Sequence, residues 1–106
     1  MPEAMVLHKP LAIIGEGDFI SGFKALGFMT YNVKNPLDAK QALEAVVKEQ
    51  CAVCLIEEEF FRNLEGEINN YRREPLPVFI PFTKSGTTAL LEEIIKGIRL
   101  RATGTF

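Results

Sequence analysis

Four short apolar runs, separated by stretches with the period of helices, constrain the fold of this chain more than any other feature. The runs lie at residues 9–14, 28–33, 51–56 and 77–81, and glycine, proline, asparagine or charged residues bound each of them, as they bound strands. Strands that alternate with helices form a parallel sheet with right-handed crossovers and helices on both faces. We therefore expect an α/β fold of the flavodoxin-like kind, with four parallel strands in the order 2-1-3-4.

The composition of the runs predicts their places in the sheet. The first and third runs are almost continuously apolar, which is typical of strands that are buried on both faces of a parallel sheet. Pro77 and Pro81 flank the fourth run. Because proline has no N–H for the hydrogen-bond ladder, the fourth strand should be short and lie near an edge.

Three helices are expected between the strands. In the first, Asp18 is a candidate N-cap and Gly27 a natural stop. The second begins at Asn35–Pro36, a good helix start. The third opens with the acidic residues 57–59, expected to be solvated or to form the polar rim of an interface, and ends at Glu74–Pro75. The apolar stripes comprise Phe19, Ile20, Phe23 and Leu26; Ala39, Ala42, Leu43, Val46 and Val47; and Phe60, Phe61, Leu64, Ile68 and Tyr71.

The end of the chain has a different character. Residues 82–88 are rich in turn-forming residues, and an amphipathic helix is expected after them. Its apolar stripe includes Leu91, Ile94, Ile95, Ile98 and Ala102, and its charged side carries Glu92, Glu93, Lys96 and Arg99. An isolated helix of this length is marginal in water. It therefore either folds back onto the sheet as a last helix or docks on a helix of a partner. We divide the chain into an α/β body, 1–81, and a hinge loop with a C-terminal helix, 82–106.

Charge and hydropathy exclude two classes of partner. The net charge is -2 and the isoelectric point is about 5.4, so no global positive field favours nucleic acid. The uncharged apolar runs, Leu11–Ile14 among them, are all far short of the ~20 residues that span a membrane. The N-terminus also lacks the pattern of a secretory signal. We expect a cytoplasmic protein whose contact with a membrane comes only through partners.

The loop Gly15–Asp18 follows the first strand, where phosphate often binds in α/β proteins. A dinucleotide fingerprint requires a glycine where Ile20 stands, and the carboxylates of Glu16 and Asp18 repel phosphate. The sequence therefore favours a tight turn over a nucleotide site.

The spacing of Cys51 and Cys54 matches a C-x-x-C motif, but their expected structural setting does not. Redox pairs of this kind lie at a helix N-terminus, whereas these cysteines fall in a predicted strand, where residues three apart face opposite sides. Two cysteines are also too few for a disulfide framework. We expect two buried, unpaired thiols. His8, the only histidine, has no serine or cysteine arranged around it and does not form a catalytic site.

A phosphoryl-accepting receiver module is the alternative function, because receivers share this topology. Glu16, Asp18 and Lys84 loosely imitate the receiver's acidic residues and lysine. The acceptor position, however, holds Ile56–Glu57 in place of an aspartate, and no fifth strand is predicted. The sequence thus indicates no catalytic residue, no cofactor and no metal ligand.

Several segments together carry a family resemblance. Leu11–Gly27 contains a strand, an acidic Gly–Asp turn and a Gly-Phe-x-x-x-Gly helix, and Asn35–Pro36 opens an alanine-rich helix. Tyr71–Arg72 and Leu76–Pro81 precede a Lys-Ser-Gly loop and the amphipathic helix. In order and spacing these segments resemble the F subunit of the V-type/A-type rotary ATPases over nearly the whole chain.

The resemblance implies a non-catalytic rotor subunit. In that family, the F subunit binds the coiled coil of the D subunit, and both form the central stalk that turns inside the catalytic A/B hexamer above the membrane rotor. The family's terminal helix is mobile and is implicated in contact with the stalk and in regulating ATP hydrolysis. Carried over to this chain, the partner-binding residues are Leu90, Leu91, Ile94, Ile95 and Ile98.

The sequence departs from the family pattern in two places. Many relatives have a threonine where the third strand ends in Ile56–Glu57, and aliphatic residues where Cys51 and Cys54 stand. Neither departure touches the proposed interface. Both indicate a divergent member.

Overall fold

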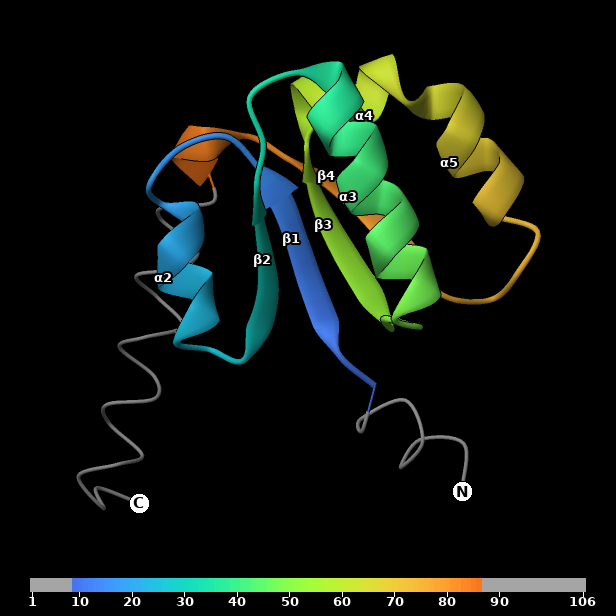
Figure 1. The fold of residues 1–106 in the computed structure, drawn as a ribbon, viewed down its shortest axis with the longest axis horizontal. Helices are drawn as coiled ribbons and strands as arrows, with labels where there is room; N and C mark the ends of the chain where they lie inside the picture. The colour runs from blue at the N-terminus through green and yellow to red at the C-terminus, as the bar shows by residue number, and fades with distance from the viewer. Residues whose placement is uncertain (1–8, 87–106) are drawn as a thin grey trace.

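The structure of the chain is a computed structural model that describes residues 9–86. Within that range the elements alternate as the sequence predicts, and the four strands form one parallel sheet in the order β2-β1-β3-β4 (Figure 1). The elements are β1 (Leu11–Gly15), α2 (Ile20–Lys24), β2 (Phe28–Asn32), α3 (Pro36–Lys48), β3 (Val53–Glu57), α4 (Glu58–Asn63), α5 (Glu65–Tyr71) and β4 (Val78–Phe82). The predicted fold class and strand order are confirmed.

The inner strands are β1 and β3, as their continuous apolar runs predicted. Leu11 of β1 lies opposite Phe28 of β2 on one side and Val53 of β3 on the other. Among the strands of residues 9–86, β4 pairs only with β3, so the prediction of an edge position is also confirmed. Pro81 lies inside β4 rather than beyond it, which an edge strand tolerates because its outward N–H groups have no ladder partner to lose.

Alternate residues of the strands supply two hydrophobic clusters on opposite faces of the sheet. One face, here called the three-helix face, is covered by α3, α4 and α5 (Figure 1). The other, here called the α2 face, carries α2 over β1 and β2. The buried residues of the three-helix face are Ala12, Ile14, Val33, Ala39, Ala42, Leu43, Val46, Cys51, Cys54, Ile56, Phe60, Leu64, Ile68 and Phe79. Those of the α2 face are Ile13, Ile20 and Phe23.

The second helix begins as predicted. The Oδ1 atom of Asn35 accepts a hydrogen bond of 2.8 Å from the backbone N–H of Asp38, and Pro36 occupies the first helical position. This contact satisfies one of the N–H groups that have no partner within the helix. It fixes the start of the longest described helix, whose apolar stripe packs on β1.

The predicted cap of α2 is wrong. The residue before α2 is Phe19, already in helical conformation (φ -60°, ψ -24°), and no side chain caps the helix. Asp18 contributes its backbone carbonyl, which accepts from the N–H of Ser21 at 3.0 Å. The chain enters the helical conformation early, so the backbone itself satisfies the first N–H groups. Gly27, with φ +89°, lies between α2 and β2 as expected.

The predicted third helix is two helices. α4 and α5 are separated at Leu64, whose φ of -109° and ψ of 18° leave helical geometry. The apolar spacing continues through the break, because Leu64 and Ile68 are both buried in the same cluster. Asn63 and Gly66 flank the break, and both residue types weaken a helix. Periodicity alone could not reveal the interruption.

Candidate partner-binding surfaces

The loop after β1 lies at the carboxyl end of the sheet, where an α/β protein would bind a phosphate. The N–H of Glu16 donates to Oε1 of Glu57 at 2.9 Å, and the N–H of Gly17 donates to Oδ1 of Asn32 at 3.2 Å. Side chains of the protein thus already accept from the two backbone donors that a phosphate would use. The geometry agrees with the prediction of a tight turn rather than a nucleotide site.

Gly15 has a specific packing reason to be glycine. A Cβ atom at this position would lie 2.9 Å from Cδ1 of Ile20 and 3.0 Å from Cζ of Phe82. The backbone of β1 therefore approaches α2 and β4 more closely than a side chain would permit. This close approach holds the loop against the end of the sheet.

The prediction that Glu57 is a solvated helix end or part of the polar rim of an interface is wrong. It is the last residue of β3, and only 8% of it is exposed. Burial of a carboxylate is costly unless hydrogen bonds compensate it, and the N–H of Glu16 supplies one such bond. Sequence reasoning missed this because the residue begins an acidic run, whose other members, Glu58 and Glu59, are exposed at the start of α4.

The residues that imitate a receiver do not form a phosphorylation site. At the acceptor position, the Glu57 carboxylate is buried and already engaged with the β1–α2 loop. Lys84 Nζ lies 3.9 Å from Oε1 of Glu16, and both side chains are half exposed. This constellation joins the loop after β1 to the segment after β4. It presents no exposed carboxylate in the acceptor slot.

Cys51 and Cys54 are free and buried, as predicted, but they do not face opposite sides of the sheet. Cys51 precedes β3 and packs in the same cluster as Cys54. Its Sγ atom lies 3.9 Å from Sδ of Met29. Burial raises the pKa of both thiols, that of Cys54 to about 12. Both are therefore inert thiols at neutral pH rather than a redox pair. Residues 9–86 contain no cluster of three or more His, Cys, Asp or Glu side chains able to hold a metal ion.

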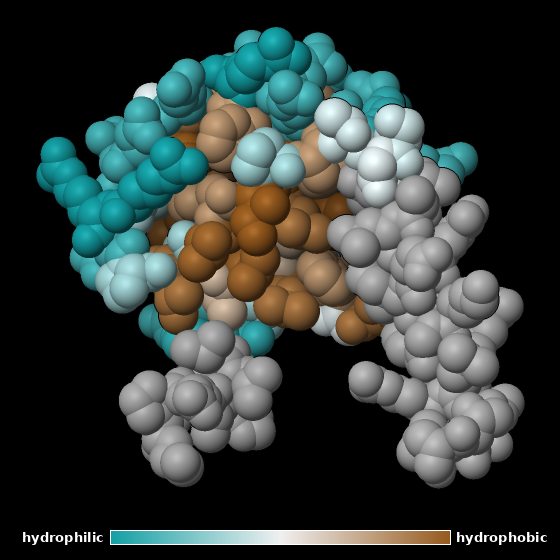
Figure 2. Space-filling view, turned by 180° about the vertical axis from the view of Figure 1, so that it is seen from behind, coloured by the Kyte–Doolittle hydropathy of each residue, from teal (hydrophilic) through white to brown (hydrophobic). Residues whose placement is uncertain are grey.

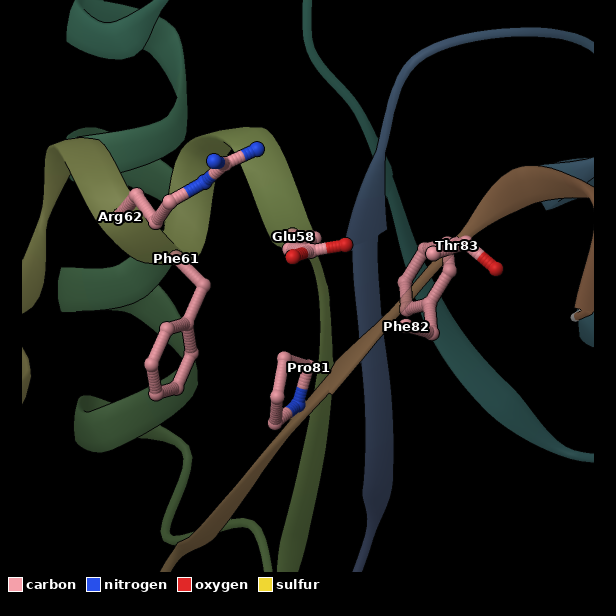
Figure 3. A pocket seen from close by; sticks show the side chains of 6 residues that line it. All are labelled: Glu58, Phe61, Arg62, Pro81, Phe82 and Thr83. Atoms are coloured by element: carbon pink, nitrogen blue, oxygen red, sulfur yellow. The ribbon is translucent and has the colours of Figure 1, made fainter.

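A hollow of about 480 Å³ lies between α4 and the end of β4 (Figure 3). Phe61 and Pro81 lie on opposite sides of it, with Glu58 and Arg62 at its rim (Figure 3). The guanidinium of Arg72 stacks over the Phe61 ring at 5.6 Å. The rings of Phe61, Pro81 and Phe82 form its apolar lining, and the side chains of Glu58, Arg62 and Thr83 form its polar lining. Such a hollow can receive a side chain of a partner protein.

The larger apolar surface lies on the α2 face, over β3 and β4. Figure 2 shows it as a brown area on the side of the molecule opposite to the view of Figure 1. Val78 and Ile80 of β4 are 46% and 43% exposed, and they lie opposite Val53 and Leu55 of β3, which are partly exposed. We name this surface the open face and define it as Leu11, Val53, Leu55, Val78 and Ile80.

Sequence analysis did not single out the open face. The signal was present, because Val78 and Ile80 alternate with buried Phe79 in the fourth run. The sequence pattern could not show that no described helix covers β3 and β4 on this face of the sheet. The five predicted partner-binding residues, Leu90 to Ile98, lie outside the described residues. Phe82 ends β4 and packs beside Ile13 and Ile20, and the division of the chain at 81/82 stays a prediction.

Comparison with known proteins identifies the family. The sequence model of the ATP synthase (F/14-kDa) subunit family matches residues 11–97. The chain belongs to this family. Membership confirms the resemblance found in the sequence and the expectation that the chain is not an enzyme by itself, since the family consists of subunits of an ATP synthase.

Individual ATP synthase F subunits support the same assignment. The V-type ATP synthase F subunit of Clostridium perfringens (strain 13 / Type A) is 29% identical over 76 residues, 72% of each chain. The F subunit of Clostridium botulinum (strain Eklund 17B / Type B) is 30% identical over 74 residues, 70% of this chain and 72% of the relative. That of Fusobacterium nucleatum is 25% identical over 96 residues, 89% of this chain and 91% of the relative.

The family match covers most of the predicted partner-binding stripe. The match includes Leu90, Leu91, Ile94 and Ile95 of the predicted stripe and ends one residue before Ile98. In the described part of this chain, the carboxyl edge of the sheet is closed by internal hydrogen bonds. Within residues 9–86, no helix combines the length and apolar character required to cross a membrane. The described surfaces with an exposed apolar lining are the hollow between α4 and β4 and the open face.

Proposed function

We propose that the chain is a central-stalk rotor subunit of a V-type/A-type rotary ATPase and has no active site of its own. The observation that carries this proposal is the family match, which extends over residues 11–97. The relatives named above are each the F subunit of a V-type ATP synthase. In this role the chain lies on the cytoplasmic side, peripheral to the membrane, and is held there by the complex.

The proposed direct partner is the coiled coil of the D subunit. An amphipathic helix docks by laying its apolar stripe on an apolar groove of its partner. Such a stripe is formed in this sequence by Leu90, Leu91, Ile94, Ile95 and Ile98. Through the D subunit the chain turns inside the A/B hexamer and is connected to the membrane-rotor subunits. It thereby couples or regulates ATP turnover and the transport of protons or sodium ions.

The α/β body supports this role as a rigid bracing element. Its three-helix face holds the larger hydrophobic cluster, and the N–H groups of Glu16 and Gly17 at its carboxyl edge are already hydrogen-bonded. A specific interface buries about 800 Å² per partner, which is more than one helical stripe provides. The hollow lined by Phe61 and Pro81 is a second apolar contact available to such a partner.

The test is co-purification of the full chain with the D subunit of the same organism. We expect a stoichiometric complex, and we expect Ile94→Asp to weaken it by at least about tenfold, because a charge replaces an apolar contact in the interface. Lys96→Asp is the matched control, since it places the same residue on the charged side of the same predicted helix. This control should bind nearly as well as the unmodified chain.

Two results would contradict the proposal. Failure to recover any complex with the D subunit would remove the rotor role. Unfolding of the whole domain by Ile94→Asp, monitored by circular dichroism, would show that the terminal helix belongs to the core and is not a docking element.

A further inference from the structure

The hollow between α4 and β4 combines apolar sides with two opposite charges at its rim. Phe61 and Pro81 lie on opposite sides of it, and Glu58 and Arg62 lie at the rim (Figure 3). These two charged residues are four apart on α4, the spacing at which a helix can form an ion pair. In the part of the chain that the structure describes, no ion pair joins them. Both side chains are exposed and can pair with groups of another protein.

We propose that this hollow receives one large apolar side chain from a helix of the D subunit, and that Glu58 and Arg62 each pair with an opposite charge on that helix. The inference rests on the proposed function and deepens it, because it names a second contact for the same partner and the chemistry of the segment that makes it. That segment is a helix in which a leucine, methionine or aromatic residue has a base and an acid within about one turn of it.

The apolar part of the hollow suits a single inserted side chain. Phe61 is partly buried against the cluster of the three-helix face, and the guanidinium of Arg72 lies 5.6 Å from the centre of its ring. Pro81 is exposed near the end of β4, and its ring is rigid. Two ring surfaces that are already held in place lose little side-chain entropy when a partner binds. The burial of an apolar side chain between them is therefore favourable.

The rim charges determine which helix fits. Glu58 attracts a base and Arg62 attracts an acid, so a helix that presents only one kind of charge at this surface is repelled by one of them. The two charges also give the contact a direction, because reversing the partner helix would bring like charges together. Since both side chains lie at an exposed rim, they should contribute mainly to the association rate and to specificity.

The size of the hollow favours a partner that is also held elsewhere on this chain. A stable interface involves about 20–30 residues on each side, whereas six residues line the hollow. A second contact with a bound partner needs less area, because it forms at the effective concentration that the first contact provides. The proposed contact of the terminal stripe with the D subunit is such a first contact. The observations therefore favour the D subunit over a second copy of the chain.

Filling the hollow in the full chain tests the apolar contact. Thr83 lines the hollow and is exposed, so Thr83→Trp places a large ring there without entering the core. We expect the affinity for the D subunit of the same organism, measured by isothermal titration calorimetry, to fall at least about tenfold. Thr83→Val is the matched control. It removes the same hydroxyl, which accepts from the N–H of Gly86 at 3.4 Å, but leaves the hollow open, so it should bind as the unmodified chain does.

Charge reversal on α4 tests the rim. Glu58→Lys and Arg62→Glu should each lower the association rate constant with the D subunit several-fold at low salt, and the difference should shrink as the salt concentration rises. Surface plasmon resonance provides the measurement. Glu59→Lys and Arg73→Glu are the matched controls, because they change the net charge by the same amounts at exposed positions that do not line the hollow.

The outcomes separate this inference from the proposed function. Equal affinities of Thr83→Trp and Thr83→Val, in complexes that still form, would overturn the insertion of a side chain and leave the rotor role in place. Equal association rates for the reversal variants and their controls would overturn the pairing of the rim charges. A dimer of the isolated chain that Thr83→Trp disrupts, detected by analytical ultracentrifugation, would assign the hollow to a second copy. Failure of the unmodified chain to bind the D subunit would remove both proposals.

Discussion

The two faces of the sheet are built from the same four strands but differ in how they are covered. On the three-helix face, α3, α4 and α5 bury residues of β1, β3 and β4. At β2 they bury only Val33, which follows the strand, while Met29 and Tyr31 are partly buried. On the α2 face, a five-residue helix buries only Ile13, Ile20 and Phe23 fully. The three-helix face therefore contributes most of the buried apolar core, and the α2 face keeps an exposed apolar surface at which another segment or protein can dock.

The strand order explains this asymmetry. The crossover from β1 to β2 runs in the opposite direction along the sheet from the crossovers β2–β3 and β3–β4. Because all crossovers of this kind are right-handed, the first helix lies on one face and the later ones on the other. The region beside β4 on the α2 face therefore has no crossover helix among residues 9–86. At the carboxyl end of the sheet, Glu57 accepts a hydrogen bond from the N–H of Glu16 in the loop before α2.

The largest expected effect compares one isoleucine from each face. Ile56 is fully buried on the three-helix face, so Ile56→Ala should lower the free energy of unfolding by about 2–5 kcal/mol. Ile80 is 43% exposed on the open face, and Ile80→Ala should cost less than about 1 kcal/mol. Urea unfolding of both variants provides the measurement. Equal losses would show that the open face is as well packed as the opposite one.

A smaller effect is expected for Glu57. Glu57→Ala leaves the N–H of Glu16 without its acceptor and should lower the free energy of unfolding by about 1–3 kcal/mol, nearer the lower value because the bond is only partly buried. Glu57→Gln keeps an acceptor of the same shape and should lose less. If the two variants are equally unstable in urea titrations, the charge rather than the hydrogen bond holds the loop.

The smallest effect at neutral pH concerns Cys54, on the three-helix face. Burial raises its pKa from 9.0 to about 12. Because the folded pKa exceeds the unfolded one, the thiol's contribution to stability is complete below pH 9.0 and is lost as the pH rises toward about 12. Cys54→Val should make the alkaline decline of the urea midpoint shallower and leave the midpoint at pH 7 nearly unchanged. If the urea midpoint of Cys54→Val declines with pH as steeply as that of the unmodified chain, the Cys54 thiol is not desolvated in the folded state.

Local sequence signals determined much of this protein. Run length and composition located the four strands within one or two residues, and Asn35–Pro36 located the start of α3. The family resemblance also followed from the order of these segments, and the family match confirmed it. These features were predictable because strand runs, caps and turns depend on neighbours in the sequence.

Only the tertiary structure decided the features that depend on contacts between distant residues. The burial of the Glu57 carboxylate is compensated by a hydrogen bond from the N–H of Glu16, which is distant in the chain. Cys51 and Cys54 share one cluster because Cys51 lies before the pleat of β3 begins. Val78 and Ile80 are exposed because the crossover helices pack elsewhere. Sequence periodicity shows which residues share a side of a strand, but the cover of that side is set by how the elements pack.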